Sequence, residues 1–478
     1  MSSFKLNALH QLSSKSSGEY FSIHSFLEEI SKRSRVQCLV ASTYRLHLPW
    51  VEEQFRSLLS QDIPMLVLHG SRNHRTKATS ASLVVEEVVP RLPRKKQQLS
   101  RGIDPEGDGD VDEQIKSIPG VHHAKYILVF VPDGLWIAIT TANLTPHSAV
   151  DGTWHQFFPL REKSQRRHRI TKATHSDFGE VLEDFITHQT QQMRSNSRGS
   201  EFSILDWIRS FVGPVSLSSS YDFEAAEVAL VSSVPGRFVF SEGTPSSTFD
   251  HCIACAAESK STRTSKVKYG LQRMRDLIES MELKSTSPED RLYIQPTSIG
   301  AISQAYMSSV LEQLMPESYW DHHHSFQLRQ ENYRILWPTS EYMRGCIGDQ
   351  DEFFDHNDEL GGLFLDPGSL ATMEPDIHSQ MYTYRASLKF RGVSPHIKTY
   401  IRILKGWRNG VSRRCTCDAL LWCLLSSACL STGKSSSSST HSTRVGAQGR
   451  RLSVNSKCKA GNFKCKGVDQ VCFHFSLF

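Results

Sequence analysis

The sequence predicts an α/β fold made of two similar units, with a single site where the units meet. Stretches with helical spacing alternate with short apolar runs of strand type, which is typical of α/β proteins. In addition, one motif, H-x-K, occurs twice, at His123 and Lys125 and again at His396 and Lys398. Each copy is followed by an apolar run and then by small polar residues. Two matching half-sites so far apart indicate a duplicated unit with one active site at the seam.

The first copy opens a predicted β-hairpin. The apolar runs 126–131 and 135–139 are joined by a Pro-Asp-Gly turn, a pattern that favours a hairpin. Because residues i and i+2 of a strand share a face, His123 and Lys125 are expected to point the same way, with Asn143 approaching from the paired strand. These three side chains suit a bound phosphate, since they supply charge, N–H donors and a nucleophile or acid/base.

The second copy reads SPHIKTY at residues 394–400, and the apolar run 419–425 comes after it. A further substrate-binding element is predicted upstream, where a strand leads through Ser298 and Gly300 into a helix over residues 301–314. A small-residue turn between a strand and a helix presents backbone N–H groups to an anion. A plain strand-to-helix connection is the alternative at this place.

The other expected elements continue the alternation. Helices are predicted over residues 22–30, 46–59, 178–190, 203–212 and 271–281, and strands over residues 37–42, 64–70, 225–232 and 333–338. Four regions are expected: a flexible N-terminus (1–20), a first domain (21–215), a second domain (216–432) and a Ser-, Lys- and Cys-rich tail (433–478) that is predicted to be disordered.

Composition and charge bound the function without deciding it. The chain has 478 residues and a net charge of +5, which is compatible with a nucleic-acid partner. No apolar run approaches the roughly 18 to 20 residues that span a membrane. A lone CxxC at Cys252 and Cys255, beside His251, allows a zinc site, but no second pair has ligand spacing. Idle thiols are the preferred interpretation, so no metal or other cofactor is predicted.

The residues around the two motifs resemble a known family. GVHHAKYILVF with TTANL, and SPHIKTY with SSACLS, are similar to the two half-motifs, H-x-K followed by Asn, of the tyrosyl-DNA phosphodiesterase 1 family, a branch of the phospholipase D superfamily. The VPGRF stretch at residues 234–238 is also similar, and the resemblance covers about residues 21–431. It implies two phospholipase D-like α/β domains, each a mixed sheet flanked by helices. A pseudo-two-fold relates these domains, and the active site lies at their interface.

The resemblance also implies a reaction. Enzymes of this family hydrolyse the phosphodiester that joins a DNA 3′ end to a tyrosine of stalled topoisomerase I, and they clear other 3′ adducts. Carried onto this chain, His123 is the nucleophile that forms a phosphohistidine, and His396 is the general acid and base. Lys125, Lys398 and Asn143 neutralise the phosphate without a metal ion.

The implied partners are single-stranded or nicked DNA 3′ ends and a topoisomerase I-derived peptide, with no membrane. The expected protein is a monomer in the nucleus, with the cytoplasm and the mitochondrion as alternative locations.

This chain departs from the family pattern at three places. The second half-site has Cys429 where the family has Asn, and a thiol cannot replace the N–H donors of a carboxamide. The supporting Gln that the family carries a few residues beyond Gln156 is absent. Family-like sequence also stops near Ser431, before an acidic residue that supports the first histidine. Two alternatives therefore stay open: a non-catalytic DNA-end binding protein with a decayed second half-site, and a lipid phosphodiesterase of the wider superfamily.

Overall fold

The computed structural model describes most of the first half of the chain and separate segments of the second half. The described residues are 3–8, 20–70, 80–88, 91–92, 118–119, 122–146, 149–161, 176–191, 202–226, 228–234, 238–240, 263–265, 269–280, 291–296, 314, 333–338, 342, 377, 379–384, 393–403, 422–424 and 473–475. Ser298, Gly300, Cys429, the CxxC pair and nearly all of the tail lie outside these residues, so the interpretations placed on them stay predictions.

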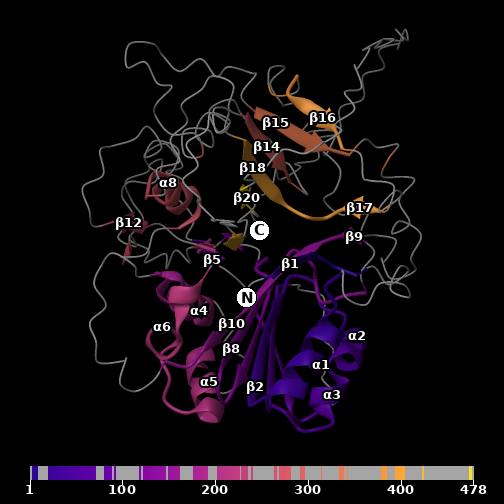
Figure 1. Ribbon diagram of the computed structural model, residues 1–478, viewed down its shortest axis with the longest axis vertical. Helices are drawn as coiled ribbons and strands as arrows, with labels where there is room; N and C mark the ends of the chain where they lie inside the picture. The colour runs from indigo at the N-terminus through magenta and orange to yellow at the C-terminus, as the bar shows by residue number, and fades with distance from the viewer. Residues whose placement is uncertain are drawn as a thin grey trace, which may run out of the picture.

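A seven-stranded mixed sheet forms the lower part of the molecule in Figure 1, in the order β1-β10-β8-β7-β2-β3-β4. Strands β2, β3 and β4 are parallel, whereas β7, β8, β10 and β1 pair antiparallel. The predicted hairpin is confirmed as β7 and β8. The bounds are β1 Ser3–Leu6, β2 Cys38–Thr43, β3 Met65–His69, β4 Leu83–Glu87, β7 Tyr126–Val131, β8 Gly134–Thr140 and β10 Gly152–Pro159.

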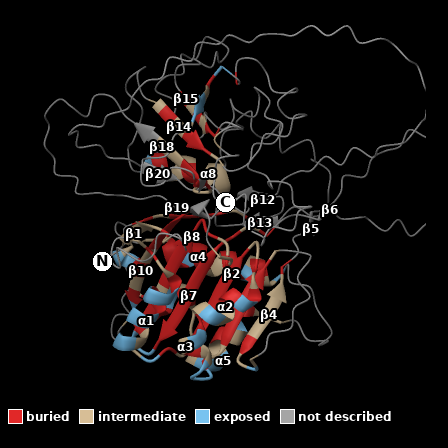
Figure 2. Cartoon of the chain, turned by 90° about the vertical axis from the view of Figure 1, so that its right-hand side faces the viewer, coloured by how far each residue is buried: buried red, intermediate tan, exposed pale blue. Residues whose placement is uncertain are grey.

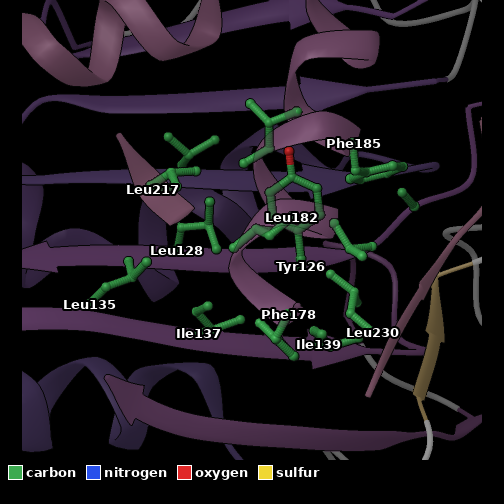
Figure 3. Close-up of a cluster of buried hydrophobic side chains, with 14 of the residues drawn as sticks. Tyr126, Leu128, Leu135, Ile137, Ile139, Phe178, Leu182, Phe185, Leu217 and Leu230 are labelled. Carbon is green, nitrogen blue, oxygen red and sulfur yellow. The ribbon is translucent and has the colours of Figure 1, made fainter. Parts of the chain in front are cut away.

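Helices cover both faces of this sheet because both faces are apolar (Figure 1). Along β7, Tyr126 and Leu128 pack with α4, α5 and α6 (Figure 3), whereas Ile127 and Val129 pack with α1, α2 and α3 on the other face. The central strands β2, β3 and β7 are entirely buried, whereas the edge strands β1 and β4 are mostly half-buried (Figure 2). Each fully buried apolar side chain contributes about 1.5 to 3 kcal/mol. The bounds are α1 Ile23–Arg33, α2 Leu48–Gln54, α3 Arg56–Leu59, α4 Phe178–Thr190, α5 Ile204–Val212 and α6 Leu217–Ser220.

A five-stranded sheet repeats part of this arrangement, in the order β16-β15-β14-β18-β20. Strands β14, β15 and β16 are parallel and β18 is antiparallel to β14, just as β2, β3 and β4 are parallel and β7 is antiparallel to β2. Each H-x-K segment directly precedes the antiparallel strand of its own sheet. The bounds are β14 Arg291–Gln295, β15 Tyr333–Trp337, β16 Met381–Thr383, β18 Thr399–Ile403 and β20 Phe473–Phe475.

Short elements complete the described part of the chain. The bounds are β5 Arg91–Leu92, β6 Ile118–Pro119, β9 Ala149–Val150, η2 Phe223–Ala225, β11 Leu230–Ser232, β12 Phe238–Phe240, β13 Arg263–Ser265, α8 Gly270–Ser280, β17 Ser394–Pro395 and β19 Trp422–Leu424. No helix among the described residues is long and apolar enough to cross a membrane.

Three expectations from the sequence are corrected. Ser3–Leu6 is a strand paired with β10 and not part of a flexible N-terminus, because four residues are too few to show a period. Phe473–Phe475, within the tail expected to be disordered, pairs with β18. The strand directly after the second H-x-K motif is β18, whose β-branched residues favour a strand. The apolar run 419–425 does contain a strand, β19, but it comes later and pairs with β11.

Candidate active site

Two short parallel strands bring the H-x-K segments of the two halves together. In β9 and β17, Ala149 pairs with Ser394 and Val150 pairs with Pro395. The next residue on each side is therefore brought face to face, and Nδ1 of His396 lies 2.7 Å from Oδ1 of Asp151. This contact joins residues 245 positions apart. The prediction that both halves contribute to one site is consistent with this geometry.

Both lysines fold back onto the carbonyl oxygen of the histidine two residues earlier, but they lie beside different ring nitrogens. Nζ of Lys125 lies 2.9 Å from the carbonyl oxygen of His123 and 2.9 Å from its Nδ1. Nζ of Lys398 lies 2.8 Å from the carbonyl oxygen of His396 and 3.0 Å from its Nε2. Both motifs lie just before a strand and not within it, and both lysines are buried. The repeated geometry supports equivalent half-sites.

Asp151 is the residue of this site that the sequence did not reveal. Its side chain is buried, and its Oδ1 accepts a hydrogen bond of 2.5 Å from the Thr141 hydroxyl. That hydroxyl accepts in turn from the N–H of Gly152, at 3.0 Å. The carboxylate of Asp151 therefore supports the His396 ring. The VDGT segment gives no local signal of this role, because the role depends on the pairing of β9 with β17.

His123 has different partners from His396. The ring of Tyr44 lies against it, with ring centroids 4.9 Å apart and a 34° angle between the planes. Its ring nitrogens face the amine of Lys125. Within the described part of the chain, no carboxylate lies at ion-pair distance from His123, whereas His396 pairs with Asp151.

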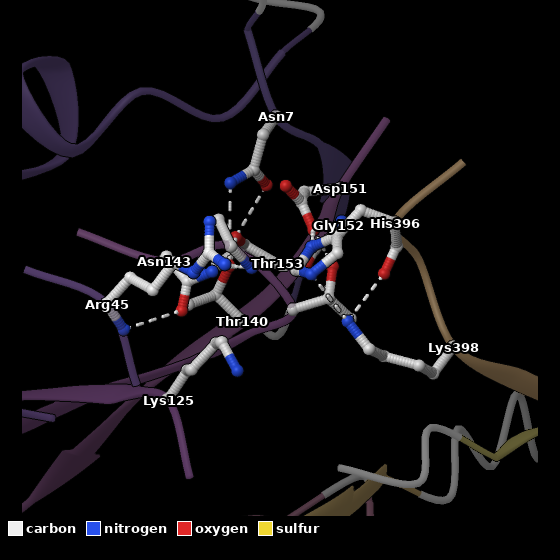
Figure 4. A network of polar contacts seen from close by, with 12 residues as sticks. Asn7, Arg45, Lys125, Thr140, Asn143, Asp151, Gly152, Thr153, His396 and Lys398 are labelled. Atoms are coloured by element: carbon white, nitrogen blue, oxygen red, sulfur yellow. Dashed lines mark hydrogen bonds and ion pairs between the residues drawn. The ribbon is translucent and has the colours of Figure 1, made fainter. Parts of the chain in front are cut away.

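Asn143 is fixed with its amide oxygen turned toward the backbone after β2 (Figure 4). Its Oδ1 accepts from the N–H of Arg45 at 3.1 Å and from the Thr43 hydroxyl at 3.5 Å. These contacts distinguish the oxygen of the amide from its nitrogen, so the Asn143 N–H donors point the other way. Asn143 therefore keeps the donors that the sequence assigned to it for binding phosphate.

Burial lowers the pKa of all four motif side chains. The pKa of Lys398 falls to about 7, although the Asp151 carboxylate opposes the effect of burial. The pKa of His396 falls to about 4 through burial and the nearby Lys398, again opposed by Asp151. Burial and the two lysines hold the pKa of His123 well below its usual range, and burial and Lys398 do the same for Lys125. These shifts favour a neutral His123, and they also reduce the charge of the two lysines until an anion binds beside them.

His122, directly before the first motif, faces away from it. Its Nε2 lies 2.8 Å from the Ser42 hydroxyl, and burial lowers its pKa to about 3. Gly70 lies so close that a Cβ there would be 2.2 Å from the carbonyl oxygen of His122. His122 therefore has a structural role, because it packs behind the site against Ser42 and Gly70.

Two H-x-K segments that meet around buried lysines define a phosphodiesterase-type hydrolase. The model of the tyrosyl-DNA phosphodiesterase family matches residues 3–434, and the chain belongs to this family. Its fold is accordingly phospholipase D-like, and its substrates are DNA-linked phosphodiesters.

Other comparisons add little. No curated protein matches the chain. Among solved structures, NucT from Helicobacter pylori is similar over 32% of this chain and 85% of its own, at 8% identity and a TM-score of 0.21. A polyphosphate kinase from Porphyromonas gingivalis is similar over 84% of this chain and 43% of its own, at 8% identity and a TM-score of 0.32. At these TM-scores neither likeness supports an inference.

Proposed function

We propose that this protein hydrolyses the phosphodiester between a DNA 3′ end and a tyrosine of stalled topoisomerase I, and that it removes other adducts from 3′ ends. The observation that carries the proposal is the pairing of His396 with Asp151 across the two halves, beside a neutral His123. One imidazole is held for proton transfer while the other keeps a lone pair for attack. The proposed protein is a monomer that acts in the nucleus.

In the first step, an unprotonated ring nitrogen of His123 attacks phosphorus. The bond between phosphorus and the tyrosine oxygen breaks, and that oxygen takes the proton of the His396 imidazolium. The product is a covalent phosphohistidine on the DNA 3′ end, together with free tyrosine or a tyrosyl peptide. His396 must carry a proton for this step, and burial and Lys398 lower its pKa to about 4. Asp151 favours the step because its carboxylate opposes that lowering.

In the second step, water attacks the phosphohistidine. His396, now neutral, accepts a proton from the water, and the bond between phosphorus and His123 breaks. The DNA leaves with a 3′-phosphate, and both imidazoles return to their starting states. Two displacements replace one difficult attack of water on an unactivated diester.

Lys125, Lys398 and the Asn143 amide would bind the phosphate oxygens through both steps. In their charged forms, the two buried lysines would supply the positive charge that stabilises a dianionic transition state, partly neutralised by Asp151. We therefore propose that the reaction needs no metal ion. Ser298 and Gly300 are proposed as further phosphate contacts from the sequence alone.

A 3′-phosphotyrosyl oligonucleotide tests the proposal in EDTA. The expected result is release of tyrosine and an oligonucleotide with a 3′-phosphate. Binding of this oligonucleotide without cleavage would favour the non-catalytic DNA-end binding protein. Hydrolysis of phospholipid vesicles, with the oligonucleotide left intact, would favour the lipid phosphodiesterase. His123→Ala is the matched control, because it removes the proposed nucleophile and leaves the charge of the site unchanged.

A further inference from the structure

The amino-terminal segment lies directly behind the site. After β1, the N–H of Asn7 donates to the carbonyl oxygen of Asp151 at 2.9 Å, which continues the pairing of β1 with β10 past its last strand residue. Asn7 is 2% exposed, and its neighbour Ala8 donates to the carbonyl oxygen of Phe21 at 2.8 Å. The segment 3–8 is therefore anchored on both sides of Asn7.

The Asn7 side chain connects β8 and β10, two neighbouring strands of the first sheet, beside the point where Asp151 precedes β10 (Figure 4). Its Oδ1 accepts from the Thr153 hydroxyl at 2.6 Å, and its Nδ2 donates to the Thr140 hydroxyl at 3.4 Å. The hydroxyl of Thr153 also lies 2.8 Å from that of Thr140. Thr140 reaches the first half-site, because its N–H donates to the carbonyl oxygen of Lys125 at 3.1 Å. All three side chains are buried.

We propose that the amino-terminal segment 3–8 belongs to the active site and that Asn7 is a positioning residue, which holds Asp151 against His396. This inference rests on the proposed function. Thr141 fixes the carboxylate of Asp151, and the backbone N–H of Asn7 fixes its carbonyl oxygen. The Asn7 side chain fixes the start of β10, directly after Asp151, through Thr153 and Thr140. Without Asn7, the start of β10 loses its side-chain anchor. A displacement of about 1 Å can cost about 10²-fold in rate when a catalytic group is misplaced.

The charged groups around His396 determine how the pH profile of the reaction should change. Asp151 stabilises the imidazolium, whereas Lys398 and Lys125 destabilise it, and His123 is the neighbouring imidazole. Moving Asp151 away therefore reduces the protonated fraction of His396. The alkaline limb of the pH profile, which reports loss of the protonated acid, then moves to lower pH.

The test uses the full chain and the 3′-phosphotyrosyl oligonucleotide. For Asn7→Ala, kcat is expected to fall about tenfold with KM nearly unchanged, and the alkaline limb is expected to move to lower pH. Asn7→Asp keeps an acceptor for Thr153 and adds a carboxylate near Asp151, so its alkaline limb is expected to move to higher pH. Ser3→Ala, at the far end of the same strand, is the matched control and should behave as the wild type.

A double-mutant cycle separates positioning from general damage. Asn7→Ala combined with Asp151→Asn is expected to be no slower than Asp151→Asn alone, since both act through His396. Additive losses, or shifts of the alkaline limb in the same direction for Asn7→Ala and Asn7→Asp, would overturn the inference. Asn7→Asp carries the test if Asn7→Ala does not fold. If the wild type itself leaves the oligonucleotide intact, the proposed function fails, which is a distinct result.

Discussion

The two H-x-K segments fold alike but give their histidines different partners. In each, the lysine amine bonds to the carbonyl oxygen of the histidine two residues earlier and lies beside its ring. The carboxylate of Asp151, which comes from the other half of the chain, lies 2.7 Å from the His396 ring. His123 instead has the Tyr44 ring, and no described carboxylate is at ion-pair distance. The local backbone is therefore shared, and the surroundings differ.

This difference assigns the two chemical roles. A carboxylate beside an imidazole stabilises the protonated form, which a general acid needs. An imidazole among cations stays neutral and keeps a lone pair, which a nucleophile needs. The causes of the pKa shifts are consistent with these roles. Asp151 opposes the lowering of the His396 pKa, whereas it has no such effect on the pKa of His123. The following experiments test this asymmetry, from the largest expected effect to the smallest.

Removing the nucleophile should have the largest effect. For His123→Ala, single-turnover cleavage of the 3′-phosphotyrosyl oligonucleotide is expected to slow by about 10⁴-fold or more, as for other nucleophile deletions. Oligonucleotide binding, measured by fluorescence anisotropy, should stay close to that of the wild type because both lysines remain. Substantial cleavage by this variant would contradict the role given to His123.

Removing the charge of Asp151 should weaken the acid/base half most, although the same carboxylate also supports the charged forms of Lys125 and Lys398. Asp151→Asn is expected to lower kcat/KM by about 10²-fold at neutral pH, since the neutral amide no longer stabilises the His396 imidazolium. The alkaline limb of kcat/KM should move to lower pH, because the pKa of His396 falls further when this carboxylate is lost. An unchanged pH profile would show that Asp151 does not act through His396.

Anion binding should depend on pH through Lys398. Burial lowers the pKa of its ammonium to about 7, and a bound anion requires the charged form. Sulfate affinity is therefore expected to be flat below that pH and to fall by about tenfold per pH unit above it, with one proton taken up on binding. Sulfate is the suitable probe because its own charge is constant over this range. Calorimetry measures the affinity, and Lys398→Gln should remove the decrease above pH 7.

Alanine substitutions at Gly70, behind the first half-site, and at Gly152, next to Asp151, should lower the unfolding free energy by different amounts. A Cβ at Gly70 would lie 2.2 Å from the backbone oxygen of His122, so Gly70→Ala is expected to cost about 1 to 3 kcal/mol of unfolding free energy and to displace the first half-site. The atoms nearest to a Cβ at Gly152 would be side-chain atoms of Phe4 and Ile397, at 2.8 and 2.9 Å. Gly152→Ala should therefore cost less. Denaturant unfolding of both variants checks the order, and equal costs would contradict it.

The sequence was sufficient to predict the elements that show a local pattern. The hairpin of β7 and β8, the helix Phe178–Thr190 and both H-x-K segments follow from periodicity and spacing. Periodicity is a local property, however, and cannot report which distant segments pair. Asp151 and Asn7 were missed for this reason, since their contacts depend on β9 with β17 and on β1 with β10. Family membership extends this prediction to the reaction class, whereas the support of each histidine requires the fold.

The most direct test of the asymmetry uses His396→Ala and an oligonucleotide with a 3′-(4-nitrophenyl phosphate). The nitrophenolate leaves without a proton, so the first step does not need His396, whereas hydrolysis of the intermediate does. The account predicts one burst of nitrophenolate per enzyme molecule, and mass spectrometry of the quenched protein should find the oligonucleotide phosphate on His123. Steady turnover with no adduct, or an adduct on another residue, would contradict the account.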